Sequence, residues 1–569
     1  MQIVDYISNI KTEKRMIRKG YIRYFLPTMG GLIFTQIAPI VDSLCISRAL
    51  GDVAVSAMSP VYPIIAIYDM FAAMIGIGGG ICMSKAGGAG NRERAGRAFT
   101  LSVISLAIVS AVLTVLFYIF MDPVLRLLSA TPDNIAYAKE YLTVFLSGSF
   151  ALVFQLAFTY ILTNDNNPNL SMAGGIVSAI VNIVIDYVGL FVLHKGIGAA
   201  AFGTVFGMFV GCMVFLLHLR KKDRMCHFVW HSNKESTIHF TEIVKPGLPQ
   251  ALSYILVIIQ SSQANYILES SLGVSGLGNV AIIYNVQIIA ATIILSVTGA
   301  AFPMFASYYG EGNKDGIRII KRISLRFGIL IFLPVMGILL VCPKLVTLLF
   351  STKDPVMLAT LPSAIRITAV AKSIMLINMV FCAHLQSVDK EETALIANVL
   401  QGIMQIVAAF FLTMVIPDNA AWYGMLLSYV ITYLYLVVFC GELKGIMSDE
   451  PESICFIRGG KVDEGAIGKW YEEARAFLSD GEADRVHEKM LVPFCGHLSR
   501  DAGIDGTFFI LEKENGDRSV ILRYDKNKDK MVEELEGLAT GEEDNMYNEC
   551  ICSRLNAVNR MMINFKAKE

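Results

Sequence analysis

The stretch LPTMGGLIFTQIAPIVDSLCISRALG, residues 26–51, corresponds without a gap to LPQALSYILVIIQSSQANYILESSLG, residues 248–273, which lies 222 positions later. Both copies begin with Leu-Pro, end with Leu-Gly and are mostly apolar in between. The repeat continues to the motif Gly90-Asn91-Arg92-Glu93, which corresponds to Gly312-Asn313-Lys314-Asp315. A duplicated set of apolar helices is typical of secondary transporters.

The composition excludes an ordinary soluble protein. The hydrophobic fraction is 54% and the charged fraction is 17%, whereas soluble domains are about 25% charged. Most of the apolar residues lie in long runs between residues 24 and 443, and a run of about 20 apolar residues crosses a bilayer. The sequence therefore predicts an all-α polytopic membrane protein with twelve transmembrane helices in two six-helix lobes, followed by a small α+β domain.

The repeat also predicts the domain boundaries. We expect an N-lobe with transmembrane helices 1–6 at residues 1–222 and a C-lobe with helices 7–12 at residues 223–445. Because each lobe has an even number of helices, the two lobes have the same orientation in the membrane. A polar linker, residues 446–453, leads to the α+β domain at 454–569.

The α+β domain has its own pattern. Two apolar runs flank an Asn515-Gly516 pair, which is a signal for a β-hairpin. A further strand is expected at Met561–Phe565, and helices are expected near 465–479, 482–500 and 544–556.

The distribution of positive charge predicts the orientation of the protein in the membrane. Lys and Arg are concentrated in the N-terminal segment and in alternate short loops, including residues 85–97, 220–224 and 314–326. Cation-rich loops face the cytoplasm, so both termini are expected there, in a multi-pass protein of the cell membrane. The net charge of −1 gives no indication of a nucleic-acid partner, and the 11 scattered cysteines form no zinc motif. We therefore expect no cofactor.

Asp42 is the first candidate functional residue. It lies inside an apolar run of the first copy, and its counterpart in the second copy is Ala264. An acid in the hydrocarbon core is costly unless it faces a cavity, is protonated or is paired. Pro39, three residues earlier, is expected to bend this helix. The alternative is that Asp42 lies close enough to the membrane surface to be solvated.

A second polar group lies on the fifth predicted helix. Asn182 and Asp186 are four residues apart, so they share one helical face. Their counterparts, at an offset of 223, are Gln405 and Ala409, and the acid is again absent from the second lobe. Thr204 lies on the next helix among small residues. Carboxylate, amide and hydroxyl oxygens suit Na⁺, with Asp42, Asn182 and Asp186 as ligands, but two nearby carboxylates equally suit a proton relay.

Other polar residues inside the apolar helices are candidates for lining a cargo cavity. Each also has a simpler interpretation, a hydrogen bond between helices or, for the lysine, snorkelling to an interface. These residues are Gln36, Tyr141, Gln155, Gln260, Gln263 and Lys372.

Residues 1–445 resemble the multidrug and toxic compound extrusion (MATE) transporters. The resemblance rests on Asp42 with the following Leu50-Gly51, on the repeated Gly-Asn loops, and on Asn182 with Asp186 and Thr204. It implies export of amphipathic, often cationic compounds in exchange for H⁺ or Na⁺ that binds to the N-lobe acids. The sequence departs from the family pattern at Tyr187, where proline is usual, and at Cys45–Arg48.

The C-terminal domain loosely resembles histidine-kinase-like ATPase domains of the anti-sigma-factor kinase type. That fold binds ATP through a helix bearing Glu and Asn and through an Asp-x-Gly turn. The corresponding helix here, residues 490–497, has neither residue, and Lys526-Asn527-Lys528 follows Asp525 in place of the glycine turn. We expect a degenerate domain that docks or regulates, with a protein partner as one option.

Three functions remain open from the sequence. The first is a secondary-active antiporter, which is not an enzyme and whose partners are small molecules and the lipid bilayer. The second is a membrane sensor with an ATP-dependent signalling domain, which needs an intact nucleotide site. The third is a lipid-linked oligosaccharide flippase, for which Lys372 is the only clear mid-helix cation.

Overall fold

Helices dominate the structure. The computed structural model describes residues 3–128, 132–220, 224–230, 237–349, 354–443, 446, 451–462, 464–492, 494–495, 504–513, 516–524, 551–555 and 558–565. Within these ranges, 11 helices are long and apolar enough to cross a membrane, or 12 if one bent pair is a single span. The polytopic helical architecture predicted from the sequence is confirmed.

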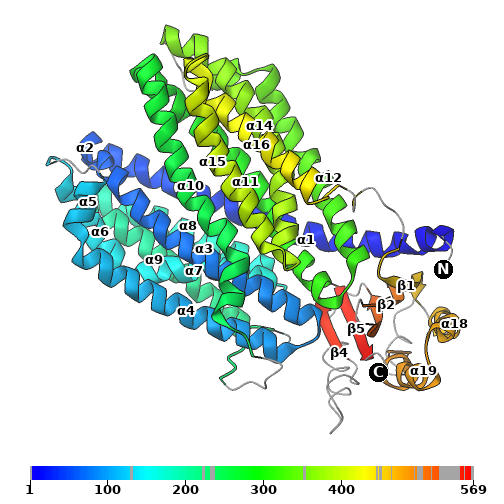
Figure 1. Ribbon diagram of the computed structural model, residues 1–569. Helices are drawn as coiled ribbons and strands as arrows, with labels where there is room; N and C mark the ends of the chain where they lie inside the picture. Colours follow the sequence, from blue (N-terminus) through cyan, green and yellow to red (C-terminus); the bar gives the residue numbers. More distant parts are fainter. Residues whose placement is uncertain are drawn as a thin grey trace.

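One group of helices comes from the first half of the chain (Figure 1), and we call it the N-lobe. Its members are α1 (Ile3–Leu50), α2 (Asp52–Ser56), α3 (Met58–Gly88), α4 (Arg92–Ile119), α5 (Met121–Leu127), α6 (Ile135–Ser147), α7 (Ser149–Asn164), α8 (Pro168–Tyr187), η1 (Val188–Val192), α9 (Gly198–Phe215) and η2 (Leu216–Arg220). Helices α6 and α7 form the bent pair, with an angle of 61° at Gly148.

The second group, which we call the C-lobe, repeats this order. Its members are α10 (Phe240–Leu272), α11 (Val274–Glu311), α12 (Lys314–Val341), α13 (Lys344–Leu349), α14 (Pro355–Ser387), α15 (Glu391–Leu412), η4 (Pro417–Asn419), α16 (Ala420–Leu434) and η5 (Tyr435–Phe439). The unbroken α14 occupies the place of the bent α6–α7 pair.

The repeated Gly-Asn motif has a structural reason in both lobes. Gly90 and Gly312 have φ angles of 82° and 78°, a left-handed conformation that glycine adopts without strain. The next residue caps the following helix: Asn91 accepts a hydrogen bond from the Arg94 amide, and Asn313 accepts one from Gly316. The motif therefore ends one helix and begins the next.

The C-terminal domain is a five-stranded antiparallel sheet with two helical segments. Its strands are β1 (Ile454–Val462), β2 (Ile504–Glu512), β3 (Arg518–Tyr524), β4 (Ile551–Leu555) and β5 (Val558–Phe565), in the spatial order β1-β2-β3-β5-β4. The helical segments are α18 (Glu464–Ala474), η6 (Arg475–Phe477), α19 (Asp480–Val486) and η7 (His487–Leu491).

Most sequence expectations for this domain are met. The predicted hairpin joins β2 to β3, although Asn515 lies outside the described residues, as does Asp525. One expectation was wrong. We expected a helix near 544–556, but residues 551–555 form β4, which pairs with β5. Residues 544–550 and 556 lie outside the described residues. Main-chain pairing at the sheet edge decided the conformation of this short segment, which local preference alone does not determine.

Both faces of the sheet are buried. Phe508, Ile510 and Val520 pack against the domain's own helices. Phe509 and Ile521, which point to the opposite face, belong to an apolar cluster shared with α1 and α11. The domain therefore docks on one end of the helix bundle (Figure 1), which we call the domain end.

The two lobes are in close contact at the domain end. A Cβ atom placed on Gly78 would lie 1.7 Å from the Ile243 carbonyl oxygen, and one on Gly247 would lie 1.9 Å from that of Met74. Only glycine permits such close approach of the α3 and α10 backbones. Arg94 also forms an ion pair with Glu242 across the lobes, at 2.8 Å.

The lobes diverge toward the opposite end (Figure 1). Tyr62 on α3 and Tyr284 on α11 are 44% and 52% exposed. The structure is thus closed between the lobes at the domain end and open away from it.

Candidate ion and cargo site

The four residues singled out on the first, fifth and sixth predicted helices come together inside the N-lobe. Asn182 Nδ2 donates to Asp186 Oδ2 at 3.2 Å and lies 3.3 Å from Thr204 Oγ1. The Asp42 and Asp186 carboxyl groups are within hydrogen-bonding reach of each other. Helices α1, α8 and α9 therefore bring two acids, one amide and one hydroxyl into one cluster, which we call the acid cluster.

The acid cluster is buried and incompletely paired. Asp42 is 7% exposed and Asp186 is fully buried. One oxygen of each carboxyl, Oδ1, has no hydrogen-bond partner. Buried polar atoms are nearly always paired, so two unpaired oxygens in one cluster leave acceptor sites for a proton or a small cation. The oxygen-only donor set suits H⁺ or Na⁺ and does not suit a soft metal.

Close packing holds the acid cluster in place. A Cβ atom on Gly203 would lie 2.2 Å from Asp186 Oδ1, so the carboxyl group packs directly on the α9 backbone. The Tyr141 hydroxyl, from α6, is within hydrogen-bonding reach of Thr204. Tyr141, which the sequence suggested as a cavity residue, thus lies beside the acid cluster.

The equivalent place in the C-lobe contains no acid. Gln405 and Ala409 on α15 are buried, and Ala409 packs so tightly that a Cβ atom on Gly424 would lie 2.6 Å from it. The C-lobe counterpart is a packed helix contact, and the asymmetry of the sequence repeat corresponds to an asymmetry in the fold.

The other candidate cavity residues are dispersed. Gln263 Nε2 donates to the Ile406 carbonyl at 2.7 Å, a bond between α10 and α15. Lys372 Nζ lies 3.1 Å from the Tyr429 hydroxyl inside the C-lobe. Gln155 is buried against Gly211. Gln36 and Gln260 are partly exposed, on α1 and α10 respectively.

Sequence reasoning missed one acid inside the helix bundle. Asp69 lies on α3, within the second predicted transmembrane helix, and its counterpart 222 residues later is Ala291. The signal that identified Asp42, an acid in an apolar run of one lobe only, applies equally to Asp69.

A second missed cluster lies where α7 ends. His218 Nε2 is 2.6 Å from Asp165 Oδ2, and the Asp165 carboxylate also accepts the backbone N–H groups of Met225 and Cys226. The Cys226 thiol completes a trio with metal-ligating atoms within 4.8 Å of one another. The carboxylate already accepts two backbone N–H groups and pairs with the imidazole, so the arrangement acts as a clamp on the chain that leaves η2.

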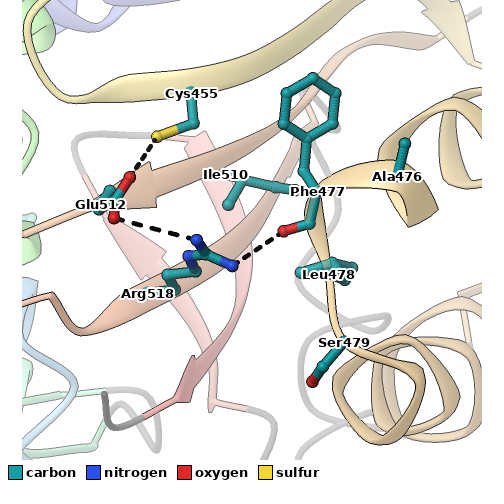
Figure 2. Close-up of a pocket in the computed structure, with 8 residues that line it drawn as sticks. All are labelled: Cys455, Ala476, Phe477, Leu478, Ser479, Ile510, Glu512 and Arg518. Atoms are coloured by element: carbon teal, nitrogen blue, oxygen red, sulfur yellow. Dashed lines mark hydrogen bonds and ion pairs between the residues drawn. The ribbon is translucent and has the colours of Figure 1, made fainter. Parts of the chain in front are cut away.

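The C-terminal domain contains a pocket of about 350 Å³ between β2, β3 and the α18–α19 connection (Figure 2). Its polar groups bond to one another: Arg518 Nη1 donates to the Phe477 carbonyl at 3.0 Å, and the Cys455 thiol donates to Glu512 at 3.2 Å. Figure 2 shows Arg518 reaching toward the Phe477 carbonyl, with Cys455 beside Glu512. No unpaired charge points to a ligand there.

Comparisons with known proteins agree with this architecture. The MatE family model matches residues 27–188 and again residues 249–411, once in each lobe. The multidrug export protein MepA of Staphylococcus haemolyticus is 24% identical over 443 residues, covering 78% of this chain and 97% of that protein. MepA of Staphylococcus aureus (strain MW2) is 23% identical over 402 residues, covering 70% and 88%.

Two solved structures have the same fold. An outward-facing multidrug resistance MATE family transporter of the MOP superfamily has a TM-score of 0.70 at 22% identity, covering 77% of this chain and 99% of that one. A MOP superfamily transporter from Pyrococcus furiosus has a TM-score of 0.69 at 23% identity, covering 76% and 95%.

Proposed function

The chain belongs to the MatE family, and from this premise we propose that it is a secondary-active antiporter that exports amphipathic, often cationic small molecules in exchange for H⁺ or Na⁺. As a multi-pass membrane transporter it is not an enzyme. Its relatives include proteins named multidrug export proteins, which supports outward transport and a broad range of cargo.

The acid cluster supports ion coupling. Asp42 and Asp186 are the two N-lobe acids that face each other, and each keeps one unpaired oxygen. When the pair has neither a proton nor a cation, its buried negative charges repel each other and are poorly solvated. Ion binding removes that penalty, so ion occupancy changes which arrangement of α1, α8 and α9 is stable.

The closed domain end supports alternating access. The lobes are joined at Gly78 and Gly247, and Tyr62 and Tyr284, on helices of the two lobes, are exposed at the other end, which supports one end state of a rocking cycle. We assign the domain end to the cytoplasm, because the cation-rich loops before α4 and α12 lie there. The open side then faces outward, ready to release cargo and to accept an ion.

The coupling ion is tested with purified full-length protein in liposomes loaded with ethidium. Either an imposed pH gradient or an imposed Na⁺ gradient should drive ethidium movement against its own gradient. Movement with the pH gradient alone identifies H⁺, and movement with the Na⁺ gradient alone identifies Na⁺. No accelerated movement with either gradient, for ethidium and for other organic cations, would contradict the antiporter proposal.

A further inference from the structure

Asp69 is placed unlike the acid cluster. It lies deep in the protein, yet its side chain is partly accessible. No hydrogen bond or ion pair to it is present within the described parts of the chain, and no charged neighbour influences it there. An acid in a membrane-spanning helix is costly unless it is paired or faces a polar group, so this unpartnered carboxyl group is available to a positively charged ligand.

One tyrosine from each lobe lies near Asp69. Tyr160 on α7 and Tyr254 on the C-lobe helix α10 are each close enough to Asp69 to interact electrostatically. Both tyrosines are also deep and partly accessible. They pack on the apolar cluster that closes the lobes, which includes Ala73 and Val297. Asp69 is therefore close to the apolar contact between the lobes.

We propose that Asp69, with Tyr160 and Tyr254, binds the positively charged group of the cargo. An anion flanked by aromatic faces stabilises an organic cation through charge and cation–π attraction. Both lobes contribute to the site, so cargo occupancy depends on how the lobes are arranged. This inference rests on the proposed export function and adds a residue for cargo that is separate from the ion-binding acids.

The test is ethidium binding to the purified full-length protein, followed by fluorescence anisotropy. Asp69→Asn should weaken binding at least about tenfold, the equivalent of 1.4 kcal/mol, and Asp69→Glu should recover most of the affinity. Asp133→Asn makes the same chemical change at an exposed loop position and should leave affinity unchanged. Equal elution profiles and melting temperatures identify folded variants.

The outcomes separate the two proposals. If the native protein binds and exports ethidium and Asp69→Asn binds it equally well, the assignment of Asp69 is wrong and the antiporter proposal stands. If the native protein neither binds nor exports organic cations, both proposals fail. Weak binding by Asp69→Asn together with weak binding by Asp69→Glu and Asp133→Asn would mean a general packing effect, which also overturns the assignment.

An independent observation concerns the C-terminal domain. Arg560 on β5 donates to the carbonyl oxygens of Gly88 and Gly87, at 2.8 and 3.0 Å, and to Glu311 Oε1 at 2.6 Å. The glycines end α3 in the N-lobe, and Glu311 ends α11 in the C-lobe. One buried guanidinium group therefore joins the two lobes.

Arg523 on β3 repeats this bridge. Its guanidinium forms ion pairs with Glu13 on α1 and with Glu311, and it stacks over the Tyr308 ring at 4.3 Å. Burial lowers the pKa of Arg523, but the two glutamates outweigh this effect and raise it above its usual value. Burial lowers the pKa of Arg560, but a guanidinium group keeps its proton at neutral pH, so separating the lobes would strand buried charges.

We infer that the C-terminal domain is a latch that holds the lobes together at the domain end. The polypeptide also ties it to the C-lobe, where Asp315 on α12 accepts the backbone N–H groups of Glu452, Ser453 and Ile454. Opening of the domain end must therefore break the N-lobe contacts of Arg560 and Arg523. The latch favours the state that is open on the opposite side and slows the return step.

The latch is tested by the distance between spin labels at Asn169 and Glu392, in a full-length background with the native cysteines replaced. These exposed residues occupy equivalent positions in the two lobes, at the starts of α8 and α15. Arg560→Gln and Glu311→Gln should each increase the ratio of long to short distances about tenfold. A change of this size lies within the usual range of coupling between distant sites in a protein.

Arg518→Gln is the matched control, because Arg518 belongs to the same domain but is 39% exposed, and its bonds among the described residues stay within that domain. It should leave the distance distribution unchanged. Identical distributions for the native protein, Arg560→Gln and Glu311→Gln would overturn the latch. Equal broadening by all three variants would overturn it too, since the effect would not depend on the interlobe contacts.

Discussion

Arg560 and Glu311 form a buried ion pair at 2.6 Å between the last strand of the C-terminal domain and the last residue of α11, with side chains 1% and 0% exposed. Because the pair is buried, removing either residue is strongly destabilising, since the other is left as an uncompensated charge in a poorly solvated place. The pair joins two residues that are 249 positions apart in the chain and so fixes the position of the C-terminal domain.

Arg560→Met should weaken docking of the C-terminal domain. We expect a loss of about 3 kcal/mol, the lower end of the range for broken buried pairs, because Glu311 retains its ion pair with Arg523. Hydrogen–deuterium exchange should become faster in β3 and β5. Arg518→Met, at an exposed position of the same sheet, should leave this exchange unchanged, and equal acceleration in both variants would contradict the prediction.

Asp42→Asn and Asp186→Asn should each abolish ion-coupled efflux while leaving the protein folded. Each change keeps size and hydrogen bonding but removes the charge that an ion must neutralise. We expect gradient-driven ethidium efflux from liposomes to fall at least about tenfold. Gln405→Ala, at the C-lobe position equivalent to Asn182, should have little effect. Loss with Asp42→Asn alone would indicate a single proton carrier on α1.

Gly247→Ala should destabilise the closed domain end. The new Cβ atom would lie 1.9 Å from the Met74 carbonyl oxygen, so α3 and α10 must move apart. Overpacking of this kind costs about 1–3 kcal/mol, which a lower melting temperature of the detergent-solubilised protein would reveal. Gly337→Ala on α12 is the control, since no atom lies within 4 Å of its added Cβ, and an equal drop there would refute the packing explanation.

Cys455 should react slowly with alkylating reagents at neutral pH. Burial and the neighbouring Glu512 raise the pKa of its thiol to about 11, and the thiolate is the reactive form. The rate should therefore keep rising as the pH increases toward 11. Glu512→Gln should increase the rate at pH 8 severalfold by removing a nearby negative charge. Mass spectrometry of Cys455, with the exposed Cys342 as a reagent control, measures both effects.

The membrane part of the fold could be predicted because a bilayer imposes simple rules. Span length, the 222-residue repeat and the Gly-Asn loops follow from local sequence, and each corresponds to an observed helix or cap. Asp42, Asn182 and Asp186 were found by the cost of a polar group in an apolar helix. Asp69 satisfied the same criterion and was missed because its flanking residues carry no motif.

The docking of the C-terminal domain was harder to predict. Arg523 and Arg560 are ordinary strand arginines in the sequence, and their burial depends on Glu13 and Glu311, which lie far away in the chain. One usable signal was present. The run Phe508–Leu511 is apolar at every position, and a strand without alternation is typical of a sheet covered on both faces.

Helix α1 runs without a break from the C-terminal domain to the acid cluster. Glu13, which contacts the C-terminal domain, and Asp42, in the acid cluster, are 29 residues apart on the same helix. At 1.5 Å per residue this separation is about 44 Å. A hinge of about 10° at Pro27 or Pro39, both inside the helix, would swing the far end by several ångströms, on the order of 2–8 Å given this rise per residue. If ion exchange tilts α1 in the proposed cycle, these displacements are large enough to engage or free a docked domain.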